Sequence, residues 1–348
     1  MKCGIVTVYD SENAGSFLQA FAMSKALASL EHEAVCLYHG FSDHSASIRK
    51  YGILLLKNLI RLGPAAAMRL VERRRLFRQA LEMLNIEKNA QTIDCFVLGS
   101  DVIWDVSENF FKNHKDFFWG AQFQNAWVIS YAPSVGFADE EDVAQCTTVA
   151  EALQRMAAVS VRDITSQRLL QPYCDQKIHV VCDPTLLIDR EEYEVLEKPT
   201  ELENFIFLYF YGKMPPEYIR QIKAFAERKN LKTVIFGNGN DWCDMSLAYD
   251  PLLFLSLYHK ADYVVTNTFH GTVFANIYEK NYVVIHNKTP KIHDFLDMCT
   301  MSDKMTRSPE DLERILCGEF DYETTRVILE KEREKGLEYL KLALKEQA

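Results

Sequence analysis

The stretch Ala261-Asp-Tyr-Val-Val-Thr-Asn-Thr-Phe-His-Gly-Thr-Val-Phe-Ala275 joins an apolar run to a helical pattern through a short polar turn. It predicts a buried strand at 263–265, a turn that presents His270, and a helix that opens at Gly271. In an open α/β sheet, ligands bind where the carboxyl end of a strand faces a helix N-terminus, because free backbone N–H groups and the helix dipole converge there. The stretch therefore predicts an α/β fold with a binding site at this turn.

His270 is the residue in this turn with the widest chemistry. A histidine can act as an acid, a base or a donor to an anion near neutral pH. The alternative is that it only caps the turn with a hydrogen bond. The small and polar neighbours Thr266, Asn267, Thr268 and Gly271 favour a binding site, since a packed core would require bulk.

Short apolar runs alternate with helical patterns along the whole chain, which is typical of parallel sheets with crossover helices. An acidic run at 189–203 indicates a connector, so we place a domain boundary near residue 190. The resulting domains are an N-terminal α/β domain at 1–190 with a basic helical insertion at about 45–90, a C-terminal α/β domain at 191–320, and a helix at 321–348 that packs back across both. Predicted elements include strands at 4–8, 95–98, 126–131 and 158–163, a helix at 143–156, and a strand at 179–182 that closes the first half, with Asp183 at its exit.

The composition of the 348 residues is that of a soluble globular protein, with 48% hydrophobic and 25% charged residues. We find no cleavable signal pattern and no apolar run of the roughly 20 residues that a membrane-spanning helix needs. These features predict a cytoplasmic protein. The nine cysteines show no metal-ligand spacing, so we expect reduced thiols and no bound metal.

The charge is unevenly distributed. The net charge is −10, but residues 49–78 hold nine basic side chains and one acid, a local +8, which leaves −18 for the remainder. The overall sign argues against a nucleic-acid partner. The segment is also apolar and helical in pattern, which fits either peripheral contact with the inner face of a membrane or an ordinary solvated pair of surface helices.

Other polar loops follow predicted strands and would line a cleft between the two domains. Asp101 follows the strand at 95–98, where it could be a base, orient a hydroxyl group or cap a helix. Arg162 ends the strand at 158–163, where its guanidinium suits an anion, although an ion pair with Asp163 or a salt bridge between the domains is the alternative. Further candidates at strand or helix ends are Asn13, Gly15, Ser16, Asn238, Asn267 and Thr268. Capping of a helix by Ser16 is an equally simple reading.

Six motifs in order make the chain similar to the polysaccharide pyruvyl transferase family. The motifs are Gly4-Ile-Val-Thr with Asn13-Ala-Gly-Ser-Phe-Leu-Gln19, Val97-Leu-Gly-Ser-Asp-Val-Ile-Trp104, Ser130-Tyr-Ala-Pro-Ser134, Ser160-Val-Arg-Asp163, Asp183-Pro-Thr-Leu-Leu187 and the stretch at 261–274. The resemblance implies two Rossmann-like domains facing across a cleft, as in GT-B glycosyltransferases. It also implies transfer of the enolpyruvyl carbons of phosphoenolpyruvate to two hydroxyls of a sugar, which forms a pyruvate ketal and releases phosphate without a cofactor.

The resemblance assigns roles to several residues. His270 would be the general acid or base, and Arg162 would bind the phosphate or carboxylate of the donor. From their positions, Gly15 and Ser16 would add donors, and Asp101 would orient or deprotonate an acceptor hydroxyl, on a sugar that is either free or lipid-linked. Several family members have an arginine just before the motif histidine, whereas Thr268-Phe269 stands here. Lys291 or Arg307 would then supply the second cation.

Two other functions fit the same residues. A GT-B glycosyltransferase would use a nucleotide sugar, for which the glycine-rich turn at 237–241 is a candidate diphosphate loop. A non-catalytic carbohydrate-binding protein of the same fold would need the cleft but not the acid–base chemistry of His270.

Overall fold

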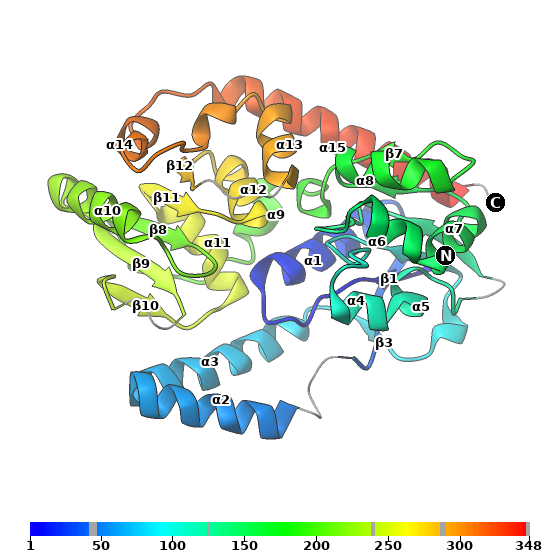
Figure 1. Ribbon diagram of the computed structural model, residues 1–348, viewed down its shortest axis with the longest axis horizontal. Helices are drawn as coiled ribbons and strands as arrows, with labels where there is room; N and C mark the ends of the chain where they lie inside the picture. Colours follow the sequence, from blue (N-terminus) through cyan, green and yellow to red (C-terminus); the bar gives the residue numbers. More distant parts are fainter. Residues whose placement is uncertain (42–46, 124–125, 238–240, 286–289, 346–348) are drawn as a thin grey trace.

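The protein consists of two parallel α/β sheets with helices on both faces, and a helical hairpin that projects from the first half (Figure 1). The structure is a computed structural model that describes residues 1–41, 47–123, 126–237, 241–285 and 290–345, with 47–50 described by their backbone alone. In this part of the chain, no helix has both the length and the apolar character required to cross a membrane.

The first sheet has the strand order β3-β2-β1-β4-β5, and all its pairs are parallel. A separate parallel pair follows it along the chain. The strands are β1 (Lys2–Val6), β2 (Glu33–Leu37), β3 (Ile86–Glu87), β4 (Cys95–Leu98), β5 (Trp127–Ser130), β6 (Ser160–Val161) and β7 (His179–Val180). The helices are α1 (Ala14–Ser29), α2 (Ser47–Leu62), α3 (Pro64–Leu81), α4 (Asn109–Asn113), α5 (Lys115–Phe118), α6 (Glu140–Gln145), α7 (Thr147–Arg155) and α8 (Ile164–Leu170).

The second sheet repeats this order as β10-β9-β8-β11-β12, again entirely parallel. Its strands are β8 (Phe205–Tyr209), β9 (Lys232–Phe236), β10 (Met245–Leu247), β11 (Tyr263–Thr266) and β12 (Asn281–Val284). The helices of this half are α9 (Arg190–Glu194), α10 (Pro216–Lys229), α11 (Pro251–Lys260), α12 (Phe269–Ile277), α13 (Pro290–Met298), α14 (Asp311–Leu316) and α15 (Tyr322–Lys345). The acidic stretch at 189–203, in which we predicted the boundary, lies along the chain between β7 and β8.

One apolar core runs between the halves. Along β4, Cys95 and Val97 belong to this shared core, whereas Phe96 and Leu98 face a separate core on the outer side of the sheet. This alternation follows from the period of two along a strand. Helix α15 joins both halves, because it packs against α12 and also bonds to β5, where the Trp127 Nε1 donates to the Ala343 carbonyl (3.1 Å).

Two predicted elements are wrong in detail. The helix predicted at 143–156 is broken at Cys146, whose extended backbone separates α6 from α7. The strand predicted at 158–163 shrinks to two residues in β6. Side chains add to the short backbone pairing with β5 there, since Ser130 Oγ donates to the Ser160 carbonyl (2.8 Å) and Ser160 Oγ donates to the Ser130 carbonyl (2.8 Å). Polar side chains that bond to the backbone compete with regular pairing.

Lys304 is a fully buried lysine whose Nζ has no hydrogen-bond partner among the described residues. Its ammonium faces the ring of Phe320, with the ring centroid 3.1 Å from Nζ. Burial lowers the pKa of Lys304 from its ordinary 10.5 to about 7. The unfolded chain therefore binds the extra proton between pH 7 and 10.5, and stability rises with pH across this window.

Replacing Lys304 with methionine should raise the free energy of unfolding near pH 7 by about 1–3 kcal/mol, because an apolar group needs no hydration. Urea unfolding of the wild type and of K304M at neutral and alkaline pH measures both the gain and the loss of the pH slope. Lys280→Met is the matched control and should lower the free energy of unfolding. The Lys280 Nζ donates to the His259 carbonyl (2.6 Å), so its removal leaves that carbonyl without this hydrogen bond. An unchanged pH slope in K304M would contradict the assignment.

Candidate functional site

Both sheets present polar loops where their strand order reverses. The reversal lies between β1 and β4 in the first sheet and between β8 and β11 in the second. Ligands bind at such switch points in open α/β sheets, because the loops from the two strands diverge there and leave a crevice. Asp101 lies in the loop after β4, and Gly15 and His270 lie in the first turns of the helices that follow β1 and β11, so these residues come from the two switch points.

His270 lies in the first turn of α12, because this helix begins at Phe269 and not at Gly271 as predicted. Thr268 caps this helix by accepting a hydrogen bond from the Gly271 N–H (2.9 Å), which fixes where the imidazole emerges. The Nε2 lies 3.8 Å from Asp183 Oδ2 and has no hydrogen-bond partner among the described residues. Burial lowers the pKa of His270 below its ordinary 6.5, and the nearby carboxylates of Asp183 and Asp101 oppose this only in part. The imidazole is therefore neutral at pH 7 and able to accept a proton.

Gly15 lies against the face of this imidazole at the start of α1. A Cβ on residue 15 would lie 2.2 Å from His270 Nδ1 and 2.4 Å from its Cγ. Only glycine allows this approach, so the N-terminus of α1 and the ring of His270 are in direct contact across the two halves. The neighbouring Asn13 caps α1 by accepting from the Gly15 N–H (2.9 Å).

Asp183 is the centre of the polar cluster, although the sequence did not indicate it as a site residue. Its Oδ2 accepts from Ser100 Oγ (3.1 Å) and from Arg162 Nη1 (2.8 Å), and its Oδ1 accepts from Thr185 Oγ1 (2.8 Å). Burial acts to raise its pKa, but His270 and Arg162 outweigh burial and hold the pKa at about 2. A signal was present, because Asp183 directly follows the predicted strand at 179–182, and Asp101 likewise lies three residues after the predicted strand at 95–98.

Arg162 is buried and has spare donors. Its Nη1 bonds to Asp183, while within the described residues Nε and Nη2 have no hydrogen-bond partner. The guanidinium lies over the ring of Phe269, 4.4 Å from the centroid, and Lys291 Nζ lies 5.9 Å from the same centroid. Burial, together with the charge of Arg162, lowers the pKa of Lys291 to about 8. Two cations are thus arranged around Phe269.

A pocket of about 390 Å³ opens beside these cations and is lined by both halves of the chain. This volume suits a small ligand. Residues from the first half include Arg162 and Asp183, and residues from the second half include Phe269 and Lys291, with Lys335 contributed by α15. Arg307, the other candidate for the second cation, is exposed and does not line this pocket.

Asp101 lies at the edge of the same cluster. Its Oδ2 accepts from Ser16 Oγ (3.2 Å), and its Oδ1 lies 3.9 Å from Arg162 Nη1. Burial opposes ionisation of Asp101, but His270 and Arg162 outweigh burial and lower the pKa. Asp101 is therefore a carboxylate at neutral pH, and Ser16 is its partner rather than the cap of α1.

The remaining candidates lie at the border of the site or outside it. Asn13 Oδ1 also accepts from the Tyr209 hydroxyl (3.3 Å), which connects the halves. Asn267 pairs with the backbone of Tyr211 through both its amide oxygen and its amide nitrogen (2.9 Å each), so its position in the loop has a structural explanation. The capping bond described above likewise occupies Thr268, and Asn238 lies outside the described residues.

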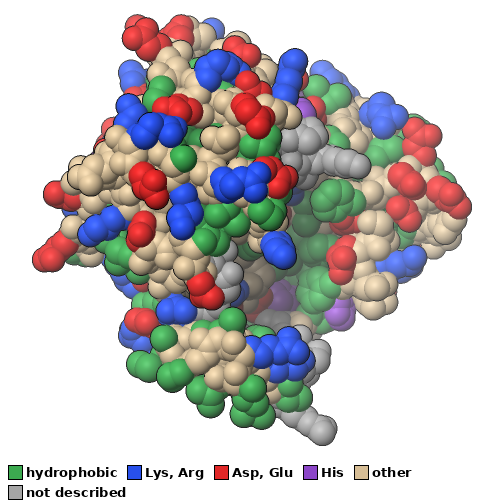
Figure 2. All heavy atoms as spheres, turned by 60° about the vertical axis from the view of Figure 1, so that its left-hand side comes forward, with side chains coloured by type: hydrophobic (Ala, Val, Ile, Leu, Met, Phe, Trp, Pro, Cys, Tyr) green, Lys and Arg blue, Asp and Glu red, His purple; other side chains and the backbone are tan. Residues whose placement is uncertain are grey.

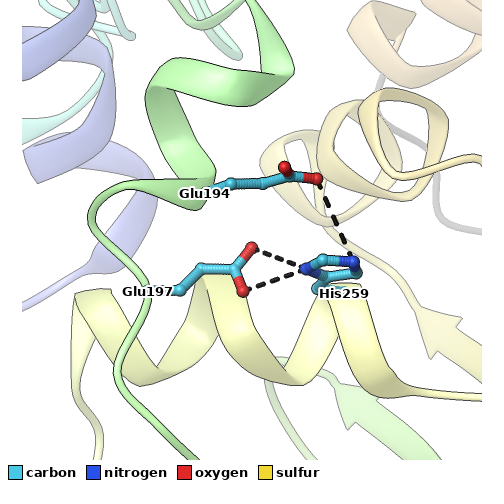
Figure 3. A group of neighbouring side chains, drawn as sticks. All are labelled: Glu194, Glu197 and His259. Atoms are coloured by element: carbon cyan, nitrogen blue, oxygen red, sulfur yellow. Dashed lines mark hydrogen bonds and ion pairs between the residues drawn. The ribbon is translucent and has the colours of Figure 1, made fainter.

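One group of described side chains has spacing compatible with a metal ion, namely Glu194, Glu197 and His259 (Figure 3). His259 Nδ1 lies 3.0 Å from both oxygens of Glu197, and its Nε2 lies 3.9 Å from Glu194 Oε1. The same Glu194 oxygen already accepts from Arg190 Nε (2.7 Å), whose charge would compete with a metal ion. We interpret the group as an ion-pair network that joins α9 to α11.

Solved structures share this fold at low sequence identity. The UDP-GlcNAc 2-epimerase from Methanocaldococcus jannaschii has a TM-score of 0.53 at 11% identity, over 91% of this chain and 92% of that chain. The UDP-N-acetylglucosamine 2-epimerase from Rickettsia bellii has a TM-score of 0.53 at 9% identity, over 97% and 95%. This likeness confirms the expected GT-B-like fold and, at such identity, nothing about activity.

The sequence itself is more informative about the family. A comparison with curated proteins finds no match. The family model described as polysaccharide pyruvyl transferase matches residues 13–289, a span that contains Gly15, Asp101, Arg162 and His270. Because that match covers more than half of the chain and includes the residues gathered at both switch points, the chain belongs to the polysaccharide pyruvyl transferase family.

Proposed function

We propose that the protein transfers the enolpyruvyl carbons of phosphoenolpyruvate to two hydroxyls of a sugar in a polysaccharide precursor, with formation of a pyruvate ketal and release of phosphate. The observation that carries this proposal is a cluster in which Arg162, with two donors unpartnered among the described residues, and a neutral His270 share Asp183, while Lys291 lines the same pocket as Arg162. Family membership supports the transferase class, and the site chemistry supports the choice of donor.

The donor carries a phosphate and a carboxylate, so its site requires two cations. Arg162 and Lys291 would supply them from opposite halves of the chain. Several members of the family have an arginine just before the motif histidine, whereas Thr268-Phe269 precede His270 here. Phe269 instead brings Arg162 and Lys291 to the pocket, because cations are attracted to an aromatic face. Lys291 is then the substitute for the missing arginine.

The reaction requires balanced proton transfers. C3 of the enol gains a proton, the bond between C2 and the phosphate oxygen breaks, and two bonds form from C2 to sugar oxygens. One hydroxyl proton replaces the proton delivered to C3, and the other leaves with phosphate. The neutral His270 would take a hydroxyl proton as general base, and the resulting imidazolium would return it as general acid. Asp183, at 3.8 Å, stabilises the imidazolium.

Asp101 would contribute to the acceptor rather than to the donor. It is ionised, and its contact with Ser16 places it where the N-terminus of α1 meets the site. A carboxylate there accepts hydrogen bonds from sugar hydroxyls and orients them toward C2 of the donor.

Replacing Lys291 with methionine should weaken binding of phosphoenolpyruvate by about tenfold or more at neutral pH, because one charged contact is lost. The wild type should lose affinity as the pH rises through about 8, since Lys291 is protonated below that pKa and neutral above it. Isothermal titration with phosphoenolpyruvate across this pH range measures both effects.

Two variants sharpen the test. Lys291→Arg keeps its charge throughout and should remove the loss of affinity above pH 8. Lys335→Met deletes a half-exposed cation of the same pocket, already paired with Glu332 (3.3 Å), and should bind nearly as the wild type does. Titration with UDP-GlcNAc tests the nucleotide-sugar alternative. Tight binding of UDP-GlcNAc with none of phosphoenolpyruvate would refute the proposed donor.

A further inference from the structure

Helices α2 and α3 form a hairpin that extends away from both sheets (Figure 1). Helix α3 lies between α2 and the body of the protein (Figure 1), where it packs against α11 and buries side chains that include Phe77 and Ala80. Helix α2 rests on α3, with the Tyr51 hydroxyl donating to the Leu70 carbonyl (3.2 Å). The outer surface of the hairpin is therefore turned away from the core.

That outer surface is unusually apolar. Exposed large hydrophobic side chains are concentrated there, with Ile60 at 74% and Met68 at 71% exposure. The exposed set on the hairpin consists of Ile53, Leu54, Leu56, Leu59, Ile60, Leu62, Met68 and Val71. A surface helix normally turns its apolar stripe toward the core. Along α2, Ile53, Leu56 and Ile60 follow helical spacing on the side opposite Tyr51, so here the stripe faces outward.

Positive charge borders this apolar stripe. Lys57 and Arg61 are exposed and lie within one turn of Ile53 and Ile60. Figure 2 shows hydrophobic side chains along the lower edge of the molecule with basic side chains beside them. The local charge of +8 at 49–78 contrasts with −18 on the rest of the chain.

We infer that the outer face of the α2–α3 hairpin is a docking surface for an anionic phospholipid bilayer. Apolar side chains would enter the boundary between headgroups and acyl chains, while Lys57 and Arg61 would reach the anionic headgroups. The acidic remainder of the chain is repelled by the same surface, so the protein would bind with the hairpin toward the lipid. Like charge disfavours the pairing of this face with its equivalent on a second copy.

The hairpin is also attached to the site. On α3, Arg73 Nη2 donates to the Glu12 carbonyl (2.9 Å), and its Nε lies 3.0 Å from the Glu12 carboxylate. Glu12 belongs to the loop that leads to the cap of α1 and to Gly15. Docking would therefore set the orientation of the site relative to the bilayer, whichever substrate the site uses.

Sedimentation with vesicles tests this inference. The wild type should bind vesicles of phosphatidylcholine mixed with phosphatidylglycerol at least about tenfold better than vesicles of phosphatidylcholine alone, and added salt should reduce binding. The pair Ile60→Ser and Met68→Ser, and separately the pair Lys57→Gln and Arg61→Gln, should each weaken binding about tenfold.

Controls separate docking from loss of structure. Val195→Ser removes an apolar side chain that is 85% exposed elsewhere on the surface, and should bind as the wild type does. All variants should unfold at the wild-type temperature, because the altered side chains are exposed. Equal recovery of the wild type in the supernatant with both kinds of vesicle would overturn the inference. So would a dimer in light scattering that the Ile60 and Met68 changes dissociate, since that face would then join two copies.

Discussion

Replacing His270 with alanine should lower the rate of pyruvyl transfer by about a hundredfold to ten-thousandfold, the range expected when a general acid or base is lost. The physical reason is that the neutral imidazole, with Asp183 3.8 Å from Nε2, would carry both proton transfers of the reaction. The measurement is phosphate released from phosphoenolpyruvate with a sugar acceptor, together with detection of the ketal by mass spectrometry.

Variants and pH make this expectation specific. His270→Gln keeps most of the volume and a hydrogen-bonding group but cannot titrate, so it should fold normally and remain as slow as alanine. His179 is exposed, so His179→Ala is the matched control and should keep wild-type activity. Protonation of His270 removes the base, so kcat/KM of the wild type should fall as the pH is lowered. The fall should occur at a pH below 6.5, the ordinary pKa of histidine, because burial lowers the pKa of His270. Undiminished phosphate release by H270A would refute the mechanism.

Replacing Gly15 with alanine should lower the rate by about a hundredfold, because a displaced catalytic group loses its alignment with the substrate. The new Cβ would lie 2.2 Å from His270 Nδ1 and 2.9 Å from its Cβ, so the whole side chain must shift. Overpacking should also reduce the free energy of unfolding by about 1–3 kcal/mol. Steady-state kinetics and urea unfolding of G15A measure the two effects.

Gly52 provides the matched control. It lies on α2, and a Cβ there would meet nothing within 4 Å. Gly52→Ala should leave kcat/KM unchanged and stabilise the hairpin slightly, because alanine favours a helix over glycine. If G15A were as active as G52A, the contact between Gly15 and His270 would have no role in catalysis.

Much of the site could be predicted from position along the chain. His270, Asp101 and Gly15 each follow a predicted strand, and parallel strands bring such loops to one edge of a sheet. Asp183 was missed because the brief strand before it was interpreted as the exit from the first half. The position of Lys291 near Phe269 depends on how α13 packs against α12, and the approach of Arg162 to the same ring depends on how the two halves pack; no local pattern encodes either.

The fold, like the site, has features that the local sequence predicts and features that depend on contacts between distant segments. Apolar runs predicted the central strands, since those runs are buried on both faces. The order of strands within each sheet and the short β3 and β10 depend on pairing between distant segments. The break at Cys146 and the short β6 arise from local backbone geometry and from the bonds between Ser130 and Ser160, where side chains outweigh periodicity.

The bond between β5 and α15 has a consequence for the order of events during synthesis. Trp127 and its partner Ala343 are 216 residues apart, so the Trp127 side chain lacks this partner until the ribosome has made the second half. Contacts so distant in sequence form slowly, because a long loop must close first. The contact between β5 and α15 is therefore expected to be among the last tertiary contacts to form during synthesis.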